Sequence, residues 1–172
     1  MANEPYKILV ADDDQDVLEH YRLIFGVDEL GGELQDPELA ILDDFLDELM
    51  KDSDLSEQDS SENPVSQWKV TLVSQGIDAV HAAQKADVEC SPFTHALLDM
   101  RMPLGMDGLQ TAIQLRAIDP EIQIIFVSAY FDYLEDDLRK ALGERWEFLQ
   151  KPFQKESILG LLVKAAGSPA SE

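Results

Sequence analysis

The stretch Ala96-Leu97-Leu98-Asp99-Met100-Arg101-Met102-Pro103 decides the fold that this sequence predicts. Its apolar first half is typical of a buried strand, and Asp99 follows directly at the carboxyl end of that strand. Open α/β sheets place their functional sites at the carboxyl ends of their strands. A carboxylate at this position therefore predicts a site on the carboxyl edge of a parallel sheet.

Three further apolar runs are followed by residues with charged or hydroxyl side chains. Ile8-Leu9-Val10-Ala11 leads into Asp12-Asp13-Asp14, Ile124-Ile125-Phe126-Val127 leads into Ser128, and Leu149-Gln150 leads into Lys151-Pro152-Phe153. The carboxyl ends of parallel strands share one edge of a sheet. We therefore expect the acids, the hydroxyl and the lysine to meet Asp99 there.

Apolar strands alternate with helical patterns along the chain, which is typical of βαβ units and a parallel sheet. We expect strands at 7–11, 68–73, 96–100, 123–128 and 147–150, and helices at about 15–26, 76–87, from 107, 133–142 and 155–166. Right-handed crossovers then give an α/β fold, a doubly wound five-stranded parallel sheet of order 2-1-3-4-5. Its switch point lies between the strands that end in Asp12 and Asp99.

The segment 28–66 does not fit this alternation, because it holds 14 Asp or Glu and one Lys. Asp36-Pro37-Glu38 suits the start of an amphipathic helix, whereas 52–64 has the composition of a disordered segment. We expect one domain over 1–166 with an acidic helical insertion, partly disordered, at 28–66, and a linker-like tail at 167–172. The apolar stripe of the insertion either packs onto the domain or docks a basic partner.

The net charge of −22 on 172 residues argues against several kinds of partner. Nucleic acid backbones and anionic membranes repel such a surface. The single Cys90 cannot form an internal disulfide, and we find neither a leader sequence nor an apolar run long enough to span a membrane. Composition thus favours a cytoplasmic protein with no direct nucleic acid partner.

The four strand ends, in this order and spacing, resemble the receiver domain of two-component response regulators, a flavodoxin-like fold. The resemblance implies that Asp99 accepts a phosphoryl group from a histidine kinase or a phosphotransfer protein. It also implies that the protein is no enzyme beyond self-phosphorylation and self-dephosphorylation. The loop from Met100 to Gly108 is one residue longer than usual, and we expect Gly105 to absorb the extra residue through a positive φ. This loop, the acidic insertion at 28–66 and the run Ala129-Tyr130-Phe131-Asp132-Tyr133 resemble receivers of multidomain signalling proteins.

The resemblance also assigns a metal site to the acids. Crowded carboxylates raise each other's pKa unless they share a cation, and Mg²⁺ prefers such ligands. By this resemblance Asp13, Asp99 and the backbone carbonyl of Arg101 bind Mg²⁺ directly, and Asp12 acts largely through water. Lys151 then contacts a phosphoryl oxygen, and Asp14 only begins the helix. A register shifted by one residue along Asp12-Asp13-Asp14 is the alternative.

One further pair of positions matches the family. Ser128 and Phe148 occupy the switch positions, where the hydroxyl moves to the phosphoryl group and the aromatic ring turns inward; simple core packing is the alternative for Phe148. The implied output surface is formed by 133–142, 147–150 and 155–166, contacts an output domain or protein, and is compatible with a phosphorylation-linked homodimer.

Arg101 and Tyr130 flank the route of a hydrolytic water, so we expect them to tune the lifetime of the phosphoryl group. Side chains that simply point into solvent are the alternative there.

Two other functions compete with this interpretation. A phosphatase of the haloacid dehalogenase type also uses a strand-end Asp with Mg²⁺ and a lysine, but it needs a general acid at the position of Arg101. A degenerate receiver would act as a binding module without phosphorylation. Such modules commonly lose the acceptor, the acid pair or the lysine, and this sequence keeps all of them.

Overall fold

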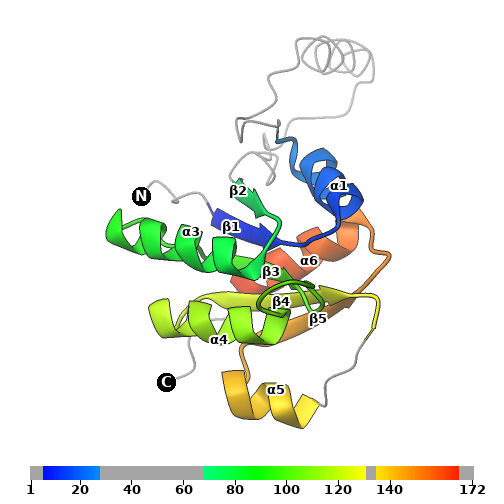
Figure 1. Ribbon diagram of the computed structural model, residues 1–172. Coiled ribbons are helices and arrows are strands. Elements are labelled where there is room, and N and C mark those ends of the chain that lie inside the picture. The colour runs from blue at the N-terminus through cyan, green and yellow to red at the C-terminus, as the bar shows by residue number, and fades with distance from the viewer. Residues whose placement is uncertain (1–5, 28–67, 131–134, 167–172) are drawn as a thin grey trace, which may run out of the picture.

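The computed structural model describes residues 6–27, 68–130 and 135–166, which form a sheet with helices on both faces (Figure 1). The elements follow in the order β1 (Tyr6–Ala11), α1 (Gln15–Phe25), β2 (Trp68–Val73), α3 (Gly76–Val88), β3 (His95–Asp99), α4 (Gly108–Ile118), β4 (Gln123–Ser128), α5 (Glu135–Leu142), β5 (Trp146–Gln150) and α6 (Lys155–Ala166). The strands pair in parallel in the order β2-β1-β3-β4-β5. The predicted fold class and strand order are confirmed.

The sheet is buried on both sides, which explains why its central strands are continuous apolar runs. In β1, Leu9 and Ala11 join a core cluster with α3, α4 and α5, whereas Ile8 and Val10 face the opposite way, toward α1 and α6. Side chains that alternate along a strand produce this division. The two packed faces leave the carboxyl edge of the sheet as the place where loops and polar residues gather.

Helix caps fix the loops at this edge. The Asp14 side chain accepts a hydrogen bond from the Asp16 N–H at 2.9 Å and so caps α1. At the start of α4, Asp107 and Gln110 form a capping box. Gly108 follows directly, and a Cβ atom there would collide with the Asp99 carbonyl. Both helices therefore begin close to the strand ends that carry the predicted site.

The expectation that Gly105 absorbs the extra residue of the β3–α4 loop is wrong. The positive φ falls on its neighbour Leu104, at 72°, and Gly105 does not adopt a left-handed conformation. The Leu104 side chain is fully exposed, so packing does not constrain its direction, although its Cβ atom makes a positive φ less favourable than it would be for glycine.

The acidic insertion predicted at 28–66 and the tail at 167–172 lie outside the described residues, as do the first two residues expected in the helix at 133–142. Within the described part of the chain, no helix is both long enough and apolar enough to span a membrane.

Candidate functional site

Three carboxylates meet at the carboxyl edge of the sheet. Asp12 and Asp13 follow β1, and Asp99 is the last residue of the neighbouring strand β3. One oxygen of each carboxylate lies within 4.8 Å of those of the other two. Asp12 is 1% exposed and Asp99 is 7% exposed, so two of the three acids are nearly shielded from water.

The hydrogen bonds of the loop after β1 distinguish the roles of its three acids. Asp12 Oδ1 accepts a hydrogen bond from the Asp14 N–H at 3.0 Å, which turns the chain into α1. The exposed Asp14 side chain caps that helix. Asp12 and Asp13 therefore belong to the cluster and Asp14 to the helix, as the unshifted register predicts.

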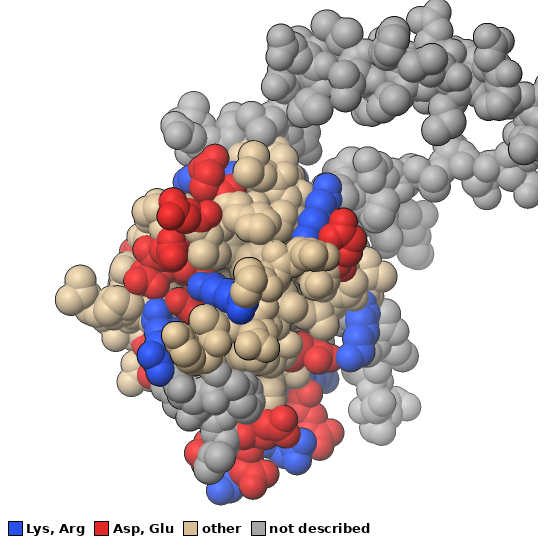
Figure 2. Space-filling model, turned by 90° about the vertical axis from the view of Figure 1, so that its right-hand side faces the viewer, with Lys and Arg blue, Asp and Glu red and all other residues tan. Residues whose placement is uncertain are grey.

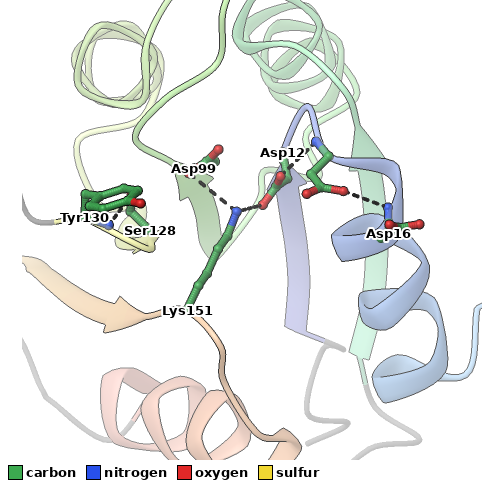
Figure 3. A network of polar contacts seen from close by, with 7 residues as sticks. Asp12, Asp16, Asp99, Ser128, Tyr130 and Lys151 are labelled. Carbon is green, nitrogen blue, oxygen red and sulfur yellow. Dashed lines mark hydrogen bonds and ion pairs between the residues drawn. The ribbon is translucent and has the colours of Figure 1, made fainter.

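Lys151 reaches into this cluster from the end of β5 (Figure 3). Its Nζ atom lies 2.6 Å from Asp12 Oδ2 and 3.6 Å from Asp99 Oδ1. The backbone N–H of Lys151 donates to the Ser128 carbonyl at 2.9 Å, and the following peptide bond to Pro152 is cis. The structure thus joins the lysine to two of the predicted acids.

Burial dominates the electrostatics of the site. It raises the pKa of Asp99 to about 6; the charges of Asp12 and Asp13 act in the same direction, while Lys151 and a backbone hydrogen bond from Arg101 oppose them. Burial also raises the pKa of Asp12, against the opposing effect of its contact with Lys151. Ionisation of these buried carboxyl groups therefore costs folding free energy, and a bound cation would reduce that cost.

Ser128 and Tyr130 lie on the side of Asp99 away from Asp12 (Figure 3). Ser128 is buried at the end of β4, and its Oγ accepts a hydrogen bond from the Tyr130 N–H at 3.3 Å. The Tyr130 ring is 62% exposed, and the guanidinium carbon of Arg101 lies 5.1 Å from its centroid. Arg101 and Tyr130 are both exposed, but they contact each other, so the loop after β3 and the loop after β4 are joined through these side chains.

Phe148 lies in β5 opposite Phe126 in the strand register. It is partly buried against the core cluster that covers the α3, α4 and α5 face of the sheet. This packing is compatible with a switch residue and equally with a core residue.

The donor set suits a hard divalent cation. The clustered side chains offer only carboxylate oxygens, and two ligands of one Mg²⁺ ion lie at most about 4.2 Å apart. A small contraction of the cluster would bring its oxygens to such distances. The residues present therefore fit the predicted magnesium site.

A cavity of about 270 Å³ beside Lys151 is a feature that the sequence did not indicate. It is lined by Val17, His20, Ala129, Lys151, Pro152 and Phe153. These residues come from α1 and from two loops, so no periodic pattern connects them.

Figure 2 views the molecule from the right-hand side of Figure 1 and shows acidic side chains gathered on one flank of this face.

Comparison with known proteins is consistent with this geometry. The family model of the response regulator receiver domain matches residues 62–163, which include Asp99, Ser128 and Lys151. The chemotaxis protein CheY of Listeria monocytogenes is 33% identical over 106 residues, covering 60% of this chain and 84% of that protein. The response regulator protein TodT of Pseudomonas putida is 34% identical over 79 residues, covering 46% of this chain and 34% of that protein.

Solved structures share the fold over nearly the whole chain. Vibrio cholerae CheY4 superimposes with a TM-score of 0.60 at 19% identity, covering 94% of this chain and 98% of that one. The receiver domain of the sensor histidine kinase PA1611 from Pseudomonas aeruginosa, solved with a magnesium ion in its active site cleft, gives 0.55 at 22% identity, covering 95% and 99%. The family match begins after Asp12 and Asp13, and the structure supplies the strand that brings these two residues to the site.

Proposed function

Because the chain belongs to the response regulator receiver domain family, we propose that it is a phosphoacceptor of a two-component phosphorelay, with Asp99 as the acceptor. The observation that carries this proposal is the complete cluster: three carboxylates whose oxygens lie within 4.8 Å, and Lys151 in contact with two of them. The donor is a histidine kinase or a phosphotransfer protein that carries a phosphohistidine.

The proposed reaction transfers one phosphoryl group. A carboxylate oxygen of Asp99 attacks phosphorus, the bond from phosphorus to the donor nitrogen breaks, and the imidazole keeps the electron pair and takes a proton from solvent. Burial raises the pKa of Asp99 to about 6, which is still below 7, so the carboxylate form that attacks phosphorus predominates at pH 7. We propose no covalent chemistry beyond self-phosphorylation and self-dephosphorylation.

The neighbours of Asp99 have distinct tasks in this proposal. Asp13, Asp99 and the Arg101 carbonyl would hold Mg²⁺ directly and Asp12 largely through water, and the ion would neutralise charge between the carboxylate and the phosphoryl oxygens. The Lys151 ammonium, 3.6 Å from Asp99 Oδ1, is placed to contact a phosphoryl oxygen on that residue. Ser128 would turn its hydroxyl toward the same group and release the Tyr130 N–H.

Arg101 and Tyr130 would set how long the phosphoryl group persists. Their contact joins the loops that follow β3 and β4, and in this proposal a water molecule passes the pair on its way to the phosphorus. The guanidinium can also hold phosphoryl oxygens by charge-assisted hydrogen bonds. Slow self-dephosphorylation follows.

The output surface that we propose consists of α5, β5 and α6. Movement of Ser128 and Phe148 would repack this surface, a population shift driven by the new charge at Asp99. α5 has acids in its first turn and bases in its last, and Figure 2 shows both signs of charge at the bottom of the molecule, where α5 lies. We propose that this surface binds an output domain, a separate protein or a second phosphorylated copy in the cytoplasm.

A binding module that works without phosphorylation is the second candidate. The half-buried Phe148, whose packing does not require a switch, is the observation that favours it. Against it stands the retention of three clustered carboxylates, with Lys151 paired to Asp12 and Asp99, since charges buried together are costly to keep without a task.

A phosphotransfer screen tests the proposal. Purified histidine kinases and phosphotransfer proteins, labelled with radioactive phosphate, are mixed with the wild type and with Asp99→Asn. We expect at least one donor to label the wild type within seconds to minutes and no donor to label the variant. Failure of every donor, although each labels its own known receiver, would favour the binding module.

A further inference from the structure

Two aromatic rings connect α1 to the loop that carries Lys151. Phe153 lies two residues after Lys151, and its ring stacks on Tyr21 of α1 with centroids 5.2 Å apart and planes inclined by 30°. Tyr21 is 1% exposed and Phe153 is 8% exposed. Tyr21 also stacks on Phe25, with centroids 6.4 Å apart and planes inclined by 10°. The ring of Phe153 is therefore held against the most buried aromatic residue of α1.

α1 is attached to the acid cluster at its other end. The helix begins soon after Asp12 and Asp13, with Asp14 as its N-cap. The backbone N–H of the same Asp14 donates a hydrogen bond to the Asp12 carboxylate. One rigid helix thus fixes the acid pair through its first turn and the Lys151 loop through Tyr21. Lys151 Nζ and Asp12 Oδ2, 2.6 Å apart, are carried by the two segments that this helix contacts.

A cavity borders the contact between this loop and the helix. The cavity of about 270 Å³ is lined by Val17 and His20 of α1 on one side and by Ala129, Lys151 and Pro152 on the other. His20 adds a tilted contact to the same Phe153 ring, at 5.3 Å. Without the Tyr21 ring, the loop could relax toward this unfilled space.

We propose that Tyr21 is a positioning residue for the phosphorylation reaction: through its stack on Phe153 it holds the Lys151 ammonium at the acid cluster. This inference rests on the proposed function, since it assigns Lys151 a place in phosphotransfer. Displacement of a charged group by about 1 Å can slow a reaction by up to about 100-fold, so loss of the stack has a measurable effect on rate.

The test compares four proteins that differ in this stack. Tyr21→Leu and Phe153→Leu each remove one ring of the contact, and Tyr21→Phe keeps both rings. Phe25→Leu is the matched control because it removes the other ring that stacks on Tyr21 and keeps both rings of the Tyr21–Phe153 stack. Each is phosphorylated with saturating acetyl phosphate and Mg²⁺, and the Mg²⁺ affinity is measured by titration calorimetry. We expect the rate to fall by about fivefold or more in the two ring-removing variants, with Mg²⁺ affinity within about twofold of wild type.

Rescue by the conservative variant separates positioning from general destabilisation. Tyr21→Phe should react at the wild-type rate, and so should Phe25→Leu despite its own loss of core packing. A wild-type rate in a folded Tyr21→Leu or Phe153→Leu, or an equal loss in Phe25→Leu, overturns the proposal. If Tyr21→Leu does not fold, Phe153→Leu decides alone.

A second measurement does not depend on phosphorylation. An ammonium held in an ion pair exchanges its protons slowly enough to give a ¹H–¹⁵N correlation signal, and Lys151→Arg assigns that signal. We expect the signal to persist in Tyr21→Phe and Phe25→Leu and to vanish in Tyr21→Leu. If the wild type accepts no phosphoryl group, the proposed function fails, while this signal still decides whether Tyr21 holds Lys151.

Discussion

The Lys151 ammonium lies 2.6 Å from Asp12 Oδ2, although the strands that carry these residues are not neighbours. β3 and β4 separate β1 from β5 in the sheet, so the lysine side chain extends across the carboxyl ends of two strands to reach Asp12. The acid is almost fully buried, and the lysine side chain is 17% exposed. The pair is therefore a shielded contact between distant parts of the sequence.

Replacement of Lys151 by Met should destabilise the protein, because it leaves the buried Asp12 carboxylate without its cation. Removal of one partner of a buried ion pair typically costs about 3 kcal/mol or more. Urea unfolding in Mg²⁺-free buffer measures the loss, and added Mg²⁺ should restore part of it. Lys155→Met, which changes an exposed lysine nearby, is the control. Equal unfolding midpoints for the two variants would show that the pair contributes nothing.

Replacement of Asp99 by Asn should stabilise the metal-free protein at pH 7.5. The folded pKa of about 6 lies above the reference value of 3.8, so this group stabilises the fold below about pH 4, and that contribution is lost as the pH rises through 6. The difference between these two pKa values corresponds to a change of about 3 kcal/mol at most in the free energy of unfolding. Asp87→Asn, at an exposed position of α3, should change little. A less stable Asp99→Asn would contradict the assigned cost of ionisation.

His95 should give a pH dependence of the opposite sign. It is 3% exposed in β3, its Nδ1 lies 2.8 Å from Thr94 Oγ1, and burial lowers its pKa to about 4. The unfolded chain therefore takes up the proton first, and stability present above about pH 6.5 is lost as the pH falls toward 4, by about 3 kcal/mol.

The pH dependences of stability that Asp99 and His95 contribute overlap between about pH 4 and 6. In the wild type they oppose each other over this range. His95→Leu should remove the loss on acidification and leave the opposite slope of Asp99 visible in urea unfolding without Mg²⁺. His81→Leu, at an exposed position of α3, is the control. Identical pH profiles for the wild type and His95→Leu would rule out this account.

Loss of the Arg101–Tyr130 pair should shorten the lifetime of the phosphorylated protein. Contacts of this kind are worth about 0.5–1 kcal/mol at exposed sites, so we expect the Arg101→Ala/Tyr130→Ala double variant to lose its phosphoryl group about 2- to 5-fold faster. The decay is followed after removal of the donor. Leu104→Ala is the control, since that fully exposed side chain lies in the same loop as Arg101. An unchanged decay rate would mean that the pair does not shield Asp99.

Sequence patterns predicted the sheet and the clustered residues because each depends on short runs. A buried parallel strand is recognisable from five or six apolar residues, and the residue that follows it must lie at the carboxyl edge. Asp12, Asp99, Ser128 and Lys151 could therefore be placed without knowledge of any contact.

Side-chain contacts between separate loops could not be predicted in the same way. The contact of Arg101 with Tyr130 and the stack of Tyr21 on Phe153 depend on loop conformations and on the angle of α1 to the sheet. Tyr21 could be recognised as a core residue from helical spacing, but spacing does not name its partner. The Gly105 prediction failed for a related reason: glycine tolerates a positive φ, but the path of the whole loop placed it on Leu104.

Phosphorylation of Asp99 by acetyl phosphate is the most direct test of the proposed function. Wild type, Asp99→Asn and Asp87→Asn are incubated with acetyl phosphate, with Mg²⁺ or with EDTA, and the modified residue is identified by mass spectrometry after reduction with borohydride. We predict one phosphoryl group on Asp99 in the wild type and in Asp87→Asn, only with Mg²⁺, and none in Asp99→Asn. Labelling that persists in Asp99→Asn, or that EDTA does not diminish, would contradict the assignment of this residue and its cluster as the phosphoacceptor site.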